Sequence, residues 1–231
     1  YLLYLKIMDW KFIISIDGAS STVKSTLARK ISNLLKFIHI DSGAMYRAVT
    51  LFAKNNHLLS NNLVDKNALI KLLPNIKVDF VKNNIHLNDT DVSKDVRDEN
   101  ISNFVSRVAE IPEVRSFLVT KQRNFTINHK VVMDGRDIGS VVFPNADIKF
   151  FLHADLNIRV ERRYNELKSL NSNITKEEVK LNIIQRDYTD SNRQDSPLIV
   201  PENAISIDVS EFDINSLFEF MMKKIHSRLS Q

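Results

Sequence analysis

The chain has 231 residues, of which 43% are hydrophobic and 26% charged, and its formal net charge is +4. This composition is ordinary for a globular protein with one sizeable core, and the lack of cysteine excludes disulfides and thiolate-bound zinc. The excess of positive charge fits an anionic partner, either nucleic acid or phosphorylated small molecules, or else a basic surface without a function. No apolar run reaches the roughly 18 residues of a membrane span. The short apolar segment 1–8 lacks the basic start and the cleavage site of a signal peptide, so we expect a cytoplasmic protein.

Hydrophobic periodicity predicts strands and helices along the first half of the chain. In chain order we expect a strand at 12–16, a helix at 25–35, a strand at 37–40, helices at 44–55 and 63–73, strands at 76–81 and 85–87, and a helix at 98–109. Pro74 ends the helix before it. The two strands that follow are predicted to form a hairpin joined at Asn83 and Asn84.

The second half of the chain shows a simpler alternation. We expect a helix from Pro112 to about Asn128, strands at 131–134 and 148–152, helices at 156–170 and 175–190, a strand at 204–209, and a C-terminal helix. Thr175 and Glu178 have the spacing of a capping box, and Asp213 is expected to cap the last helix. Together these elements predict an α/β fold, a five-stranded parallel sheet with helices on both faces. The segment 63–109 breaks the alternation, so we interpret it as an insertion over one edge of the sheet.

A phosphate-binding sequence lies between the first expected strand and the first helix. Residues 18–26 read G-A-S-S-T-V-K-S-T, and the phosphate-loop (P-loop) pattern is G-x-x-x-x-G-K-[ST]. In such a loop the backbone N–H groups surround the phosphates of ATP, the lysine adds positive charge, and the hydroxyl can bind Mg²⁺. The expected ATP-binding residues here are Gly18, Ala19, Ser20, Ser21, Thr22, Val23, Lys24, Ser25 and Thr26.

Val23 stands where the pattern has its second glycine. A β-branched residue tolerates a positive φ poorly, and its methyl groups crowd the space that a phosphate would enter. If that backbone angle is required, the strain is of order 1–3 kcal/mol. We therefore expect Val23 to impair ATP handling. The alternative is a relaxed loop, in which Ser20, Ser21 and Thr22 supply compensating contacts.

Five further segments carry arginines next to strand ends, in polar turns or on a helix. They are D-S-G-A-M-Y-R at 41–47, S-R-V-A-E-I-P-E-V-R at 106–115, V-V-M-D-G-R-D-I-G at 131–139, R-V-E-R-R at 159–163 and Q-R-D-Y-T-D-S-N-R at 185–193. Phosphoryl transfer needs in-line placement and positive charge around the transferring oxygens, and the guanidinium fork matches phosphate geometry. Open α/β sheets bind ligands at their strand C-termini. Asp134 ends a hydrophobic strand, where a carboxylate can bind Mg²⁺ through water; the alternative is that it caps a helix or lies in a turn. For Arg162 the alternative is a place on the solvated face of its helix.

The combination of D-S-G-A-M-Y-R-A-V, D-G-R-D-I-G-S-V-V-F-P and R-D-x-x-D-x-N-R resembles the bacterial cytidylate kinases, from about residue 12 to 229. The resemblance implies a P-loop kinase fold and one kinase domain over 1–231. Its core would be about 11–62 and 110–231, its insertion for the nucleoside monophosphate about 63–109, and its short lid about 186–198. It also implies transfer of the γ-phosphoryl group of ATP to CMP or dCMP, with Mg²⁺ as cofactor.

The same resemblance implies roles for individual residues. The CMP-binding residues would be Ser42, Arg47, Ser106, Arg115, Arg136, Asp137, Arg186 and Asp190. Arg159 and Arg163 would touch the adenine and phosphates of ATP, and Ser25 and Asp134, the latter through water, would bind the metal. The catalytic residues would be Lys24, Arg136, Arg186 and Arg193, with Arg193 stabilising the moving phosphoryl group from the lid.

Other functions stay open on the sequence. A kinase for UMP or another monophosphate is one, and the trio Ser106, Arg115 and Asp137 favours cytosine over it. A nucleotide-binding homologue weakened by Val23 is another, and the intact lysine and arginines argue against it. A nucleic-acid-binding module would need clustered aromatic and basic residues, which the sequence lacks. We expect a monomer whose partners are ATP and CMP or dCMP, with no nucleic acid and no membrane.

Overall fold

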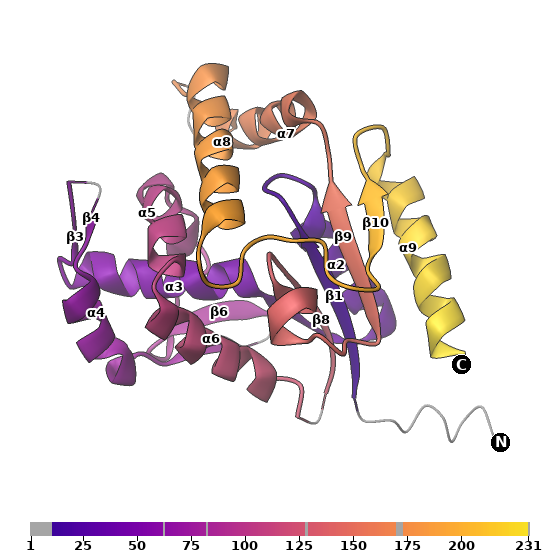
Figure 1. Cartoon of the computed structure of the whole chain (residues 1–231), viewed down its shortest axis with the longest axis horizontal. Helices are drawn as coiled ribbons and strands as arrows, with labels where there is room; N and C mark the ends of the chain where they lie inside the picture. Colours follow the sequence, from indigo (N-terminus) through magenta and orange to yellow (C-terminus); the bar gives the residue numbers. More distant parts are fainter. Residues whose placement is uncertain (1–10, 62, 82, 128, 170–172, 231) are drawn as a thin grey trace.

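The computed structural model describes residues 11–61, 63–81, 83–127, 129–169 and 173–230 (Figure 1). The expected helix ends at Asn128 and Leu170 and the apolar segment 1–8 lie outside these residues. A five-stranded sheet in the order β10-β9-β1-β8-β2 forms the centre, and all four strand pairs are parallel, as predicted. Its strands are β1 (Phe12–Gly18), β2 (Ile38–Asp41), β8 (Lys130–Gly135), β9 (Ile148–His153) and β10 (Ile205–Asp208).

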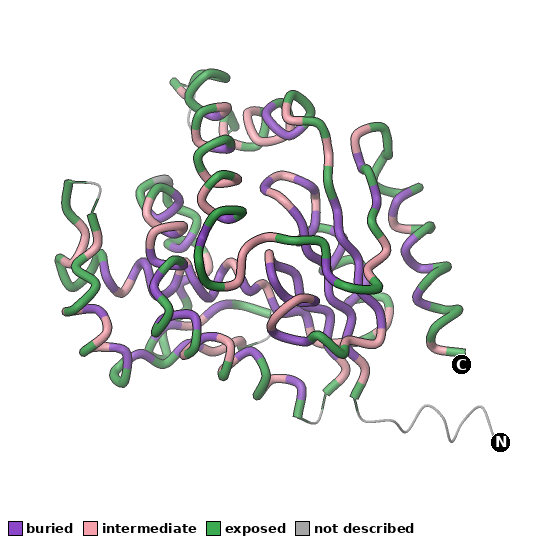
Figure 2. Tube along the Cα trace, in the orientation of Figure 1, coloured by how far each residue is buried: buried purple, intermediate pink, exposed green. Residues whose placement is uncertain are grey.

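Helices cover both faces of this sheet because successive strand residues point to opposite sides. Ile14 and Ile16 of β1 pack with α2 (Lys24–Leu35) and α9 (Ile214–Leu229) in what we call the α2–α9 cluster. Ile13 of the same strand packs into a larger cluster with α3 (Ser42–Asn55) and α6 (Pro112–Asn124). Figure 2 shows the buried residues concentrated along the strands and the inner sides of these helices.

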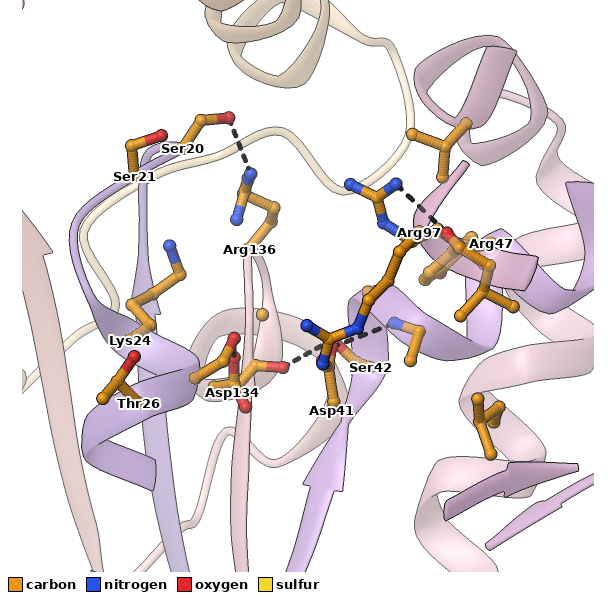
Figure 3. A pocket seen from close by; sticks show the side chains of 18 of the residues that line it. Ser20, Ser21, Lys24, Thr26, Asp41, Ser42, Arg47, Arg97, Asp134 and Arg136 are labelled. Atoms are coloured by element: carbon orange, nitrogen blue, oxygen red, sulfur yellow. Dashed lines mark hydrogen bonds between the residues drawn. The ribbon is translucent and has the colours of Figure 1, made fainter. Parts of the chain in front are cut away.

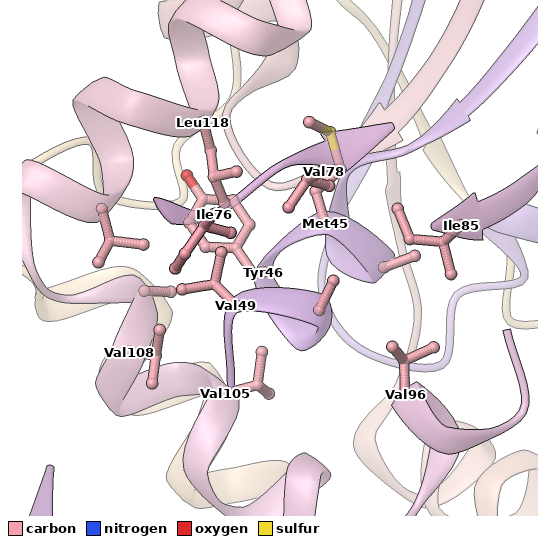
Figure 4. Packing of buried hydrophobic residues seen from close by; sticks show 14 of the residues in the cluster. Met45, Tyr46, Val49, Ile76, Val78, Ile85, Val96, Val105, Val108 and Leu118 are labelled. Carbon is pink, nitrogen blue, oxygen red and sulfur yellow. The ribbon is translucent and has the colours of Figure 1, made fainter. Parts of the chain in front are cut away.

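The residues between α3 and α6 form a lobe on one side of the sheet (left in Figure 1). Its elements are β3 (Leu59–Ser60), β4 (Leu63–Val64), α4 (Lys66–Leu72), a 3₁₀ turn (Leu73–Asn75), β5 (Val78–Val81), β6 (Asn84–Leu87), β7 (Thr90–Asp91), a second 3₁₀ turn (Asp95–Arg97) and α5 (Glu99–Ala109). Met45 and Val49 of α3 pack with Val78, Ile85 and Val105 of the lobe (Figure 4). The lobe therefore shares one hydrophobic core with the sheet.

The predicted helix at 63–73 is wrong over its first residues. Leu63 and Val64 pair with β3 as an antiparallel strand, and α4 begins only at Lys66, after Asp65 caps it by accepting from the backbone N of Ala68. The predicted hairpin is confirmed, since β5 and β6 pair antiparallel, but β7 adds a third strand that the sequence did not predict. Strands of two residues show no hydrophobic period, which is why periodicity missed them.

In the last third of the chain, α7 (Leu156–Lys168) and α8 (Lys176–Asn192) pack on one another over the end of the sheet where β1 leads into α2 (top of Figure 1). The predicted capping box of Thr175 and Glu178 is confirmed, and so is the cap of α9 by Asp213. A five-residue π-helix, Ile138–Val142, follows β8 and was not predicted. None of the described helices is long and apolar enough to cross a membrane.

Candidate active site

The expected phosphate loop connects the end of β1 to the start of α2. Gly18 has a φ of 145°, and a Cβ at this position would overlap the backbone carbonyl of Leu152, so only glycine fits. No side chain caps the start of α2. The first N–H groups of a helix lack internal partners, and together with the helix dipole they favour an anion. The loop therefore has the backbone of a phosphate-binding site.

Val23 adopts the left-handed conformation, with φ 57° and ψ 17°. The condition under which we expected strain, a positive φ at the glycine position of the pattern, is therefore met. The valine side chain is half-buried and packs against the α2–α9 cluster, although the residue also lines the cavity described below. The loop carries contacts of its own, because Thr22 Oγ1 donates to the Ala19 carbonyl at 3.0 Å. The backbone is thus strained at Val23, while its side chain has a place to pack.

Lys24 is buried at the base of the loop. Its Nζ donates to the carbonyl of Ala19 at 2.5 Å and to Thr22 Oγ1 at 3.1 Å. Burial, followed by the nearby Arg136 guanidinium, lowers the pKa of Lys24 well below its usual value. A bound anion would offset both effects, since it stabilises the charged ammonium.

Asp134 ends β8 next to the first turn of α2. Its Oδ2 accepts from Ser25 Oγ at 2.5 Å, and its Oδ1 lies 2.8 Å from Nε2 of His39. Burial tends to raise the pKa of Asp134, but the hydrogen bonds and charges of His39, Ser25 and Lys24 outweigh it, so the pKa is lowered. The carboxylate faces the loop instead of capping a helix; the cap of α3 is Asp41.

A carboxylate and a hydroxyl at the phosphate loop suit Mg²⁺, which keeps several waters and binds through one or two protein oxygens plus substrate phosphates. Ser25 and Asp134 provide these two oxygens side by side. Across the part of the chain that the structure describes, no three His, Asp or Glu side chains gather into a closed metal site. The residues present therefore fit a metal that arrives with a nucleotide.

Arginines line a cavity of about 1110 Å³ that opens beside the loop, as Figure 3 shows for Arg47, Arg97 and Arg136. Burial, followed by Arg47 and Arg136, lowers the pKa of Arg186 to about 9. Burial, followed by Arg163, likewise lowers the pKa of Arg47 to about 10. The buried Nε of Arg186 has no hydrogen-bond partner among the described residues. Mutually repelling guanidinium groups around a free N–H indicate an anion site.

Arg136 connects this cluster to the phosphate loop. Its Nη2 donates to Ser20 Oγ at 3.0 Å, and its Nε donates to Asp190 Oδ2 at 2.8 Å. Arg136, Arg186 and Arg193 also hold the pKa of Asp190 low against its burial. One guanidinium therefore spans the expected ATP and acceptor sides of the cavity.

At the far side of the cavity, Arg115 and Asp137 form a buried ion pair. Arg115 is only 2% exposed, donates its Nη1 to the Ala109 carbonyl at 3.1 Å and lies 5.5 Å from the ring centre of Tyr46. Its Nε is buried and has no hydrogen-bond partner among the described residues. Ser106 lines the same cavity. The predicted trio of Ser106, Arg115 and Asp137 thus faces one space.

Two other predicted residues, Arg193 and Ser42, lie next to these groups. Arg193 lies 3.8 Å from Asp137 and 3.6 Å from Asp190, and its Nε donates to the Ser196 carbonyl at 2.6 Å. The contact of Arg193 with a moving phosphoryl group therefore stays a prediction. Ser42 is buried and donates to the carbonyl of Asp134 at 2.7 Å.

The arginines of α7 divide between the loop, the cavity and the sheet. Arg159 donates to the Ser20 carbonyl at 3.5 Å and to Asp187 at 2.5 Å. Arg163 lines the cavity and pairs with Glu166 at 2.9 Å. Arg162 donates to the Val209 carbonyl at 2.8 Å, so it ties α7 to the end of β10 and is not a purely solvated side chain.

Sequence reasoning missed three residues at the site. Arg97 lines the cavity from the insertion (Figure 3), but a single arginine in a polar stretch gave no signal. His39 was missed because it lies within an apolar strand. Asp17, at the end of β1, accepts from the backbone N–H groups of Ile138 at 2.8 Å and Gly139 at 2.7 Å, and only its place beside the loop could have suggested it.

The curled loop after the first strand, its lysine, the Ser25–Asp134 pair and the facing arginines define a phosphoryl-transfer enzyme of the P-loop class. The family model for cytidylate kinase matches residues 14–227. The cytidylate kinase of Flavobacterium johnsoniae is 43% identical over 222 residues, covering 94% of this chain and 96% of the relative. The cytidylate kinase of Fusobacterium nucleatum is 43% identical over 213 residues, covering 92% and 96%. The chain belongs to the cytidylate kinase family, whose members are nucleoside monophosphate kinases.

One solved structure adds a likeness in fold alone. An uncharacterized protein from Eubacterium ventriosum superposes with a TM-score of 0.52 at 12% identity, covering 94% of this chain and 99% of that chain. Such low identity carries no information on the substrate.

Proposed function

We propose that this chain transfers the γ-phosphoryl group of ATP to CMP or dCMP, giving ADP and CDP or dCDP. The observation that carries the acceptor is the buried pair of Arg115 and Asp137, which faces the cavity opposite the phosphate loop. A cytosine edge has an amino donor, a ring-nitrogen acceptor and a carbonyl acceptor, so a carboxylate and a guanidinium can read it together. Membership of the cytidylate kinase family supports the same substrate.

The donor half of the site holds the triphosphate through its backbone. The N–H groups of residues 18–26 and the Lys24 ammonium surround the phosphates, and Arg159 and Arg163 flank the adenine side from α7. Mg²⁺ bound with ATP would neutralise phosphate charge, and Ser25 and Asp134 are the residues that would hold it. Arg136 donates to Ser20 of the loop in this structure, which supports a position next to the transferred group.

The acceptor half orients the monophosphate. Arg47, Arg136 and Arg186 bind its phosphate, Ser106 and Asp137 with Arg115 bind the base, and Asp190 with Ser42 supports the sugar region. No general base is needed, because the acceptor phosphate is already an anionic nucleophile. The chemistry therefore depends on positioning and on positive charge at the transferring oxygens, to which Arg193 contributes from the lid.

The segment 186–198 acts as the lid in this proposal. Its closure over the nucleotides excludes water and so suppresses ATP hydrolysis. The insertion around 63–109 supplies the acceptor side of the cavity through Ser106 and Arg97. The proposed site needs no residue from a second copy of the chain, so the proposal includes a monomer as the active unit. The nucleotide substrates support a cytoplasmic place of action.

Measurement of ADP release with each nucleoside monophosphate in turn tests the proposal. CMP and dCMP are expected to be the best acceptors, with UMP weaker, because uracil presents a carbonyl where cytosine has its amino donor. A higher kcat/KM for AMP or dTMP would overturn the assignment. No observation favours a kinase for another monophosphate or an inactive homologue.

A further inference from the structure

We propose that His39 is a positioning residue that holds the Asp134 carboxylate in the orientation that binds the metal of the ATP complex. His39 lies on β2, and its Nε2 is 2.8 Å from Asp134 Oδ1. The two side chains are each only 4% exposed. On β8, Val132 lies opposite His39, and Asp134 lies two residues further along. The imidazole therefore reaches diagonally to Asp134 on the same face of the sheet.

The imidazole lies on a face of the sheet that is otherwise apolar around it. Val132, its strand neighbour, and Phe37, two residues before it, both pack in the α2–α9 cluster. A buried polar ring destabilises the fold unless it is hydrogen-bonded. The bond that His39 makes goes to a carboxylate that also accepts from Ser25 of the phosphate loop, which argues for more than a satisfied core histidine.

The two bonds of Asp134 fix its orientation from opposite sides. His39 on β2 holds Oδ1, and Ser25 on α2 holds Oδ2 at 2.5 Å. An ionised carboxylate has about four lone-pair sites, so two remain after these bonds. The carboxylate is therefore fixed in its plane and still able to accept from a metal-bound water. Without the imidazole, Oδ1 would be buried without a partner. The carboxylate could then rotate, which would weaken the bond between Oδ2 and Ser25.

Groups that orient a metal-binding carboxylate typically contribute 10–100-fold to metal affinity. The inference rests on the proposed function only in assuming that the loop binds ATP with Mg²⁺. It predicts a loss that appears in the metal-dependent part of ATP binding and leaves the metal-free part nearly unchanged, because the loop N–H groups and Lys24 contact the phosphates independently of His39.

Isothermal titration of the whole chain with ATP, with Mg²⁺ and with EDTA, tests this. His39→Leu removes the donor at similar volume, and His39→Gln keeps an N–H near the place of Nε2. Ile40→Val is the matched control, a small change in a fully buried neighbour on the same strand. We expect the Mg²⁺-dependent gain in ATP affinity to fall about 10–100-fold in His39→Leu and to stay within about threefold of wild type in the other two variants. Urea unfolding of each variant checks that it is folded.

A double variant separates positioning from general weakening of the strand. If His39 acts through Asp134, adding His39→Leu to Asp134→Asn should cause no further loss of the Mg²⁺-dependent gain. A further loss of similar size overturns the inference. So does an unchanged gain in His39→Leu, an equal loss with and without Mg²⁺, or a wild-type protein whose ATP affinity ignores Mg²⁺. A protein that binds ATP with Mg²⁺ as expected but does not phosphorylate CMP would refute the proposed function and leave the role of His39 standing.

Discussion

Replacing Val23 by glycine is expected to relieve a strained backbone at the heart of the phosphate loop. Val23 has a φ of 57°, where a residue with a Cβ is destabilised by about 1–2 kcal/mol. The side chain is half-buried against the α2–α9 cluster, so its removal costs roughly 1 kcal/mol, about half the value for full burial. Glycine also gains freedom in the unfolded chain, worth about 0.5–1 kcal/mol. These terms nearly cancel, so the free energy of unfolding should change by less than about 1 kcal/mol.

Val23→Ala separates strain from packing. Alanine loses the contacts of the valine methyl groups but keeps a Cβ in the left-handed conformation. We therefore expect Val23→Gly to be more stable than Val23→Ala by about 1 kcal/mol, the reverse of their usual order. Urea unfolding of the three proteins measures this. If Val23→Ala is the more stable variant, the backbone at Val23 does not hold a positive φ in solution and the reasoning fails.

The Val23→Gly substitution should also improve the use of ATP. We expect Val23→Gly to raise kcat/KM for ATP about tenfold, equivalent to about 1.4 kcal/mol, with kcat/KM for CMP little changed because the expected CMP contacts lie across the cavity. Steady-state kinetics with each substrate varied in turn measure both. Equal values for ATP would show that valine is accommodated, with Thr22 and its bond to Ala19 supplying the compensation.

Arg193→Ala is expected to lower kcat roughly a thousandfold with a much smaller change in the Kd for CMP; a larger effect on Kd would assign the residue to the base, beside Asp137. Asp137→Ala should lower kcat/KM for CMP and narrow the preference over UMP, since an unpaired buried polar group costs about 1–3 kcal/mol, and an unchanged preference would contradict its role. Burial raises the pKa of Asp17 to about 7, above the 3.8 of an exposed carboxyl, although two backbone N–H groups favour its charged form. Its contribution to stability is therefore complete below about pH 4 and is lost as the pH rises through 7. The free energy of unfolding of wild type relative to Asp17→Asn should fall by up to about 4 kcal/mol between pH 4 and 8 in urea titrations, and a flat difference would count against it.

The sequence was sufficient to predict the strands and helices whose pattern is local. The buried strands β1, β8 and β9 are mostly apolar runs, interrupted only by Ser15 in β1 and Lys149 in β9 before their polar ends. The helices α7, α8 and α9 have caps or hydrophobic periods that can be recognised without any tertiary contact. The π-helix after β8 depends on Asp17, which accepts from its first N–H groups from 121 and 122 residues away. Such a bond exists only once β1 and β8 have paired, so no window of sequence could predict it.

The site divides in the same way. The phosphate loop could be predicted because Gly18, Lys24 and Ser25 lie in one short stretch of sequence. The partner of an arginine could not be predicted where it comes from a distant part of the chain. The sequence does not say which acidic residue Arg115 faces, and its pairing with Asp137 follows from the packing of α6 against the π-helix that begins after Asp137. His39 had no signal, because a histidine in an apolar strand is the same in sequence whether it meets a carboxylate or a carbonyl.

If the proposed site residues are right, the end of β8 aligns the two substrates without a hinge between them. Asp134 faces Ser25 of the loop, Arg136 contacts both Ser20 and Asp190, and Asp137 pairs with Arg115 across the cavity. Consecutive Cα atoms are about 3.8 Å apart, so the groups proposed to bind the metal, the phosphates and the base lie within four residues at one buried strand end. Because β8 is paired on both sides, with β1 and β2, its end cannot move without disturbing both neighbours. A displacement of β8 would therefore weaken the binding of both substrates together. A displacement of the lid would change the site mainly through Asp190 and Arg193.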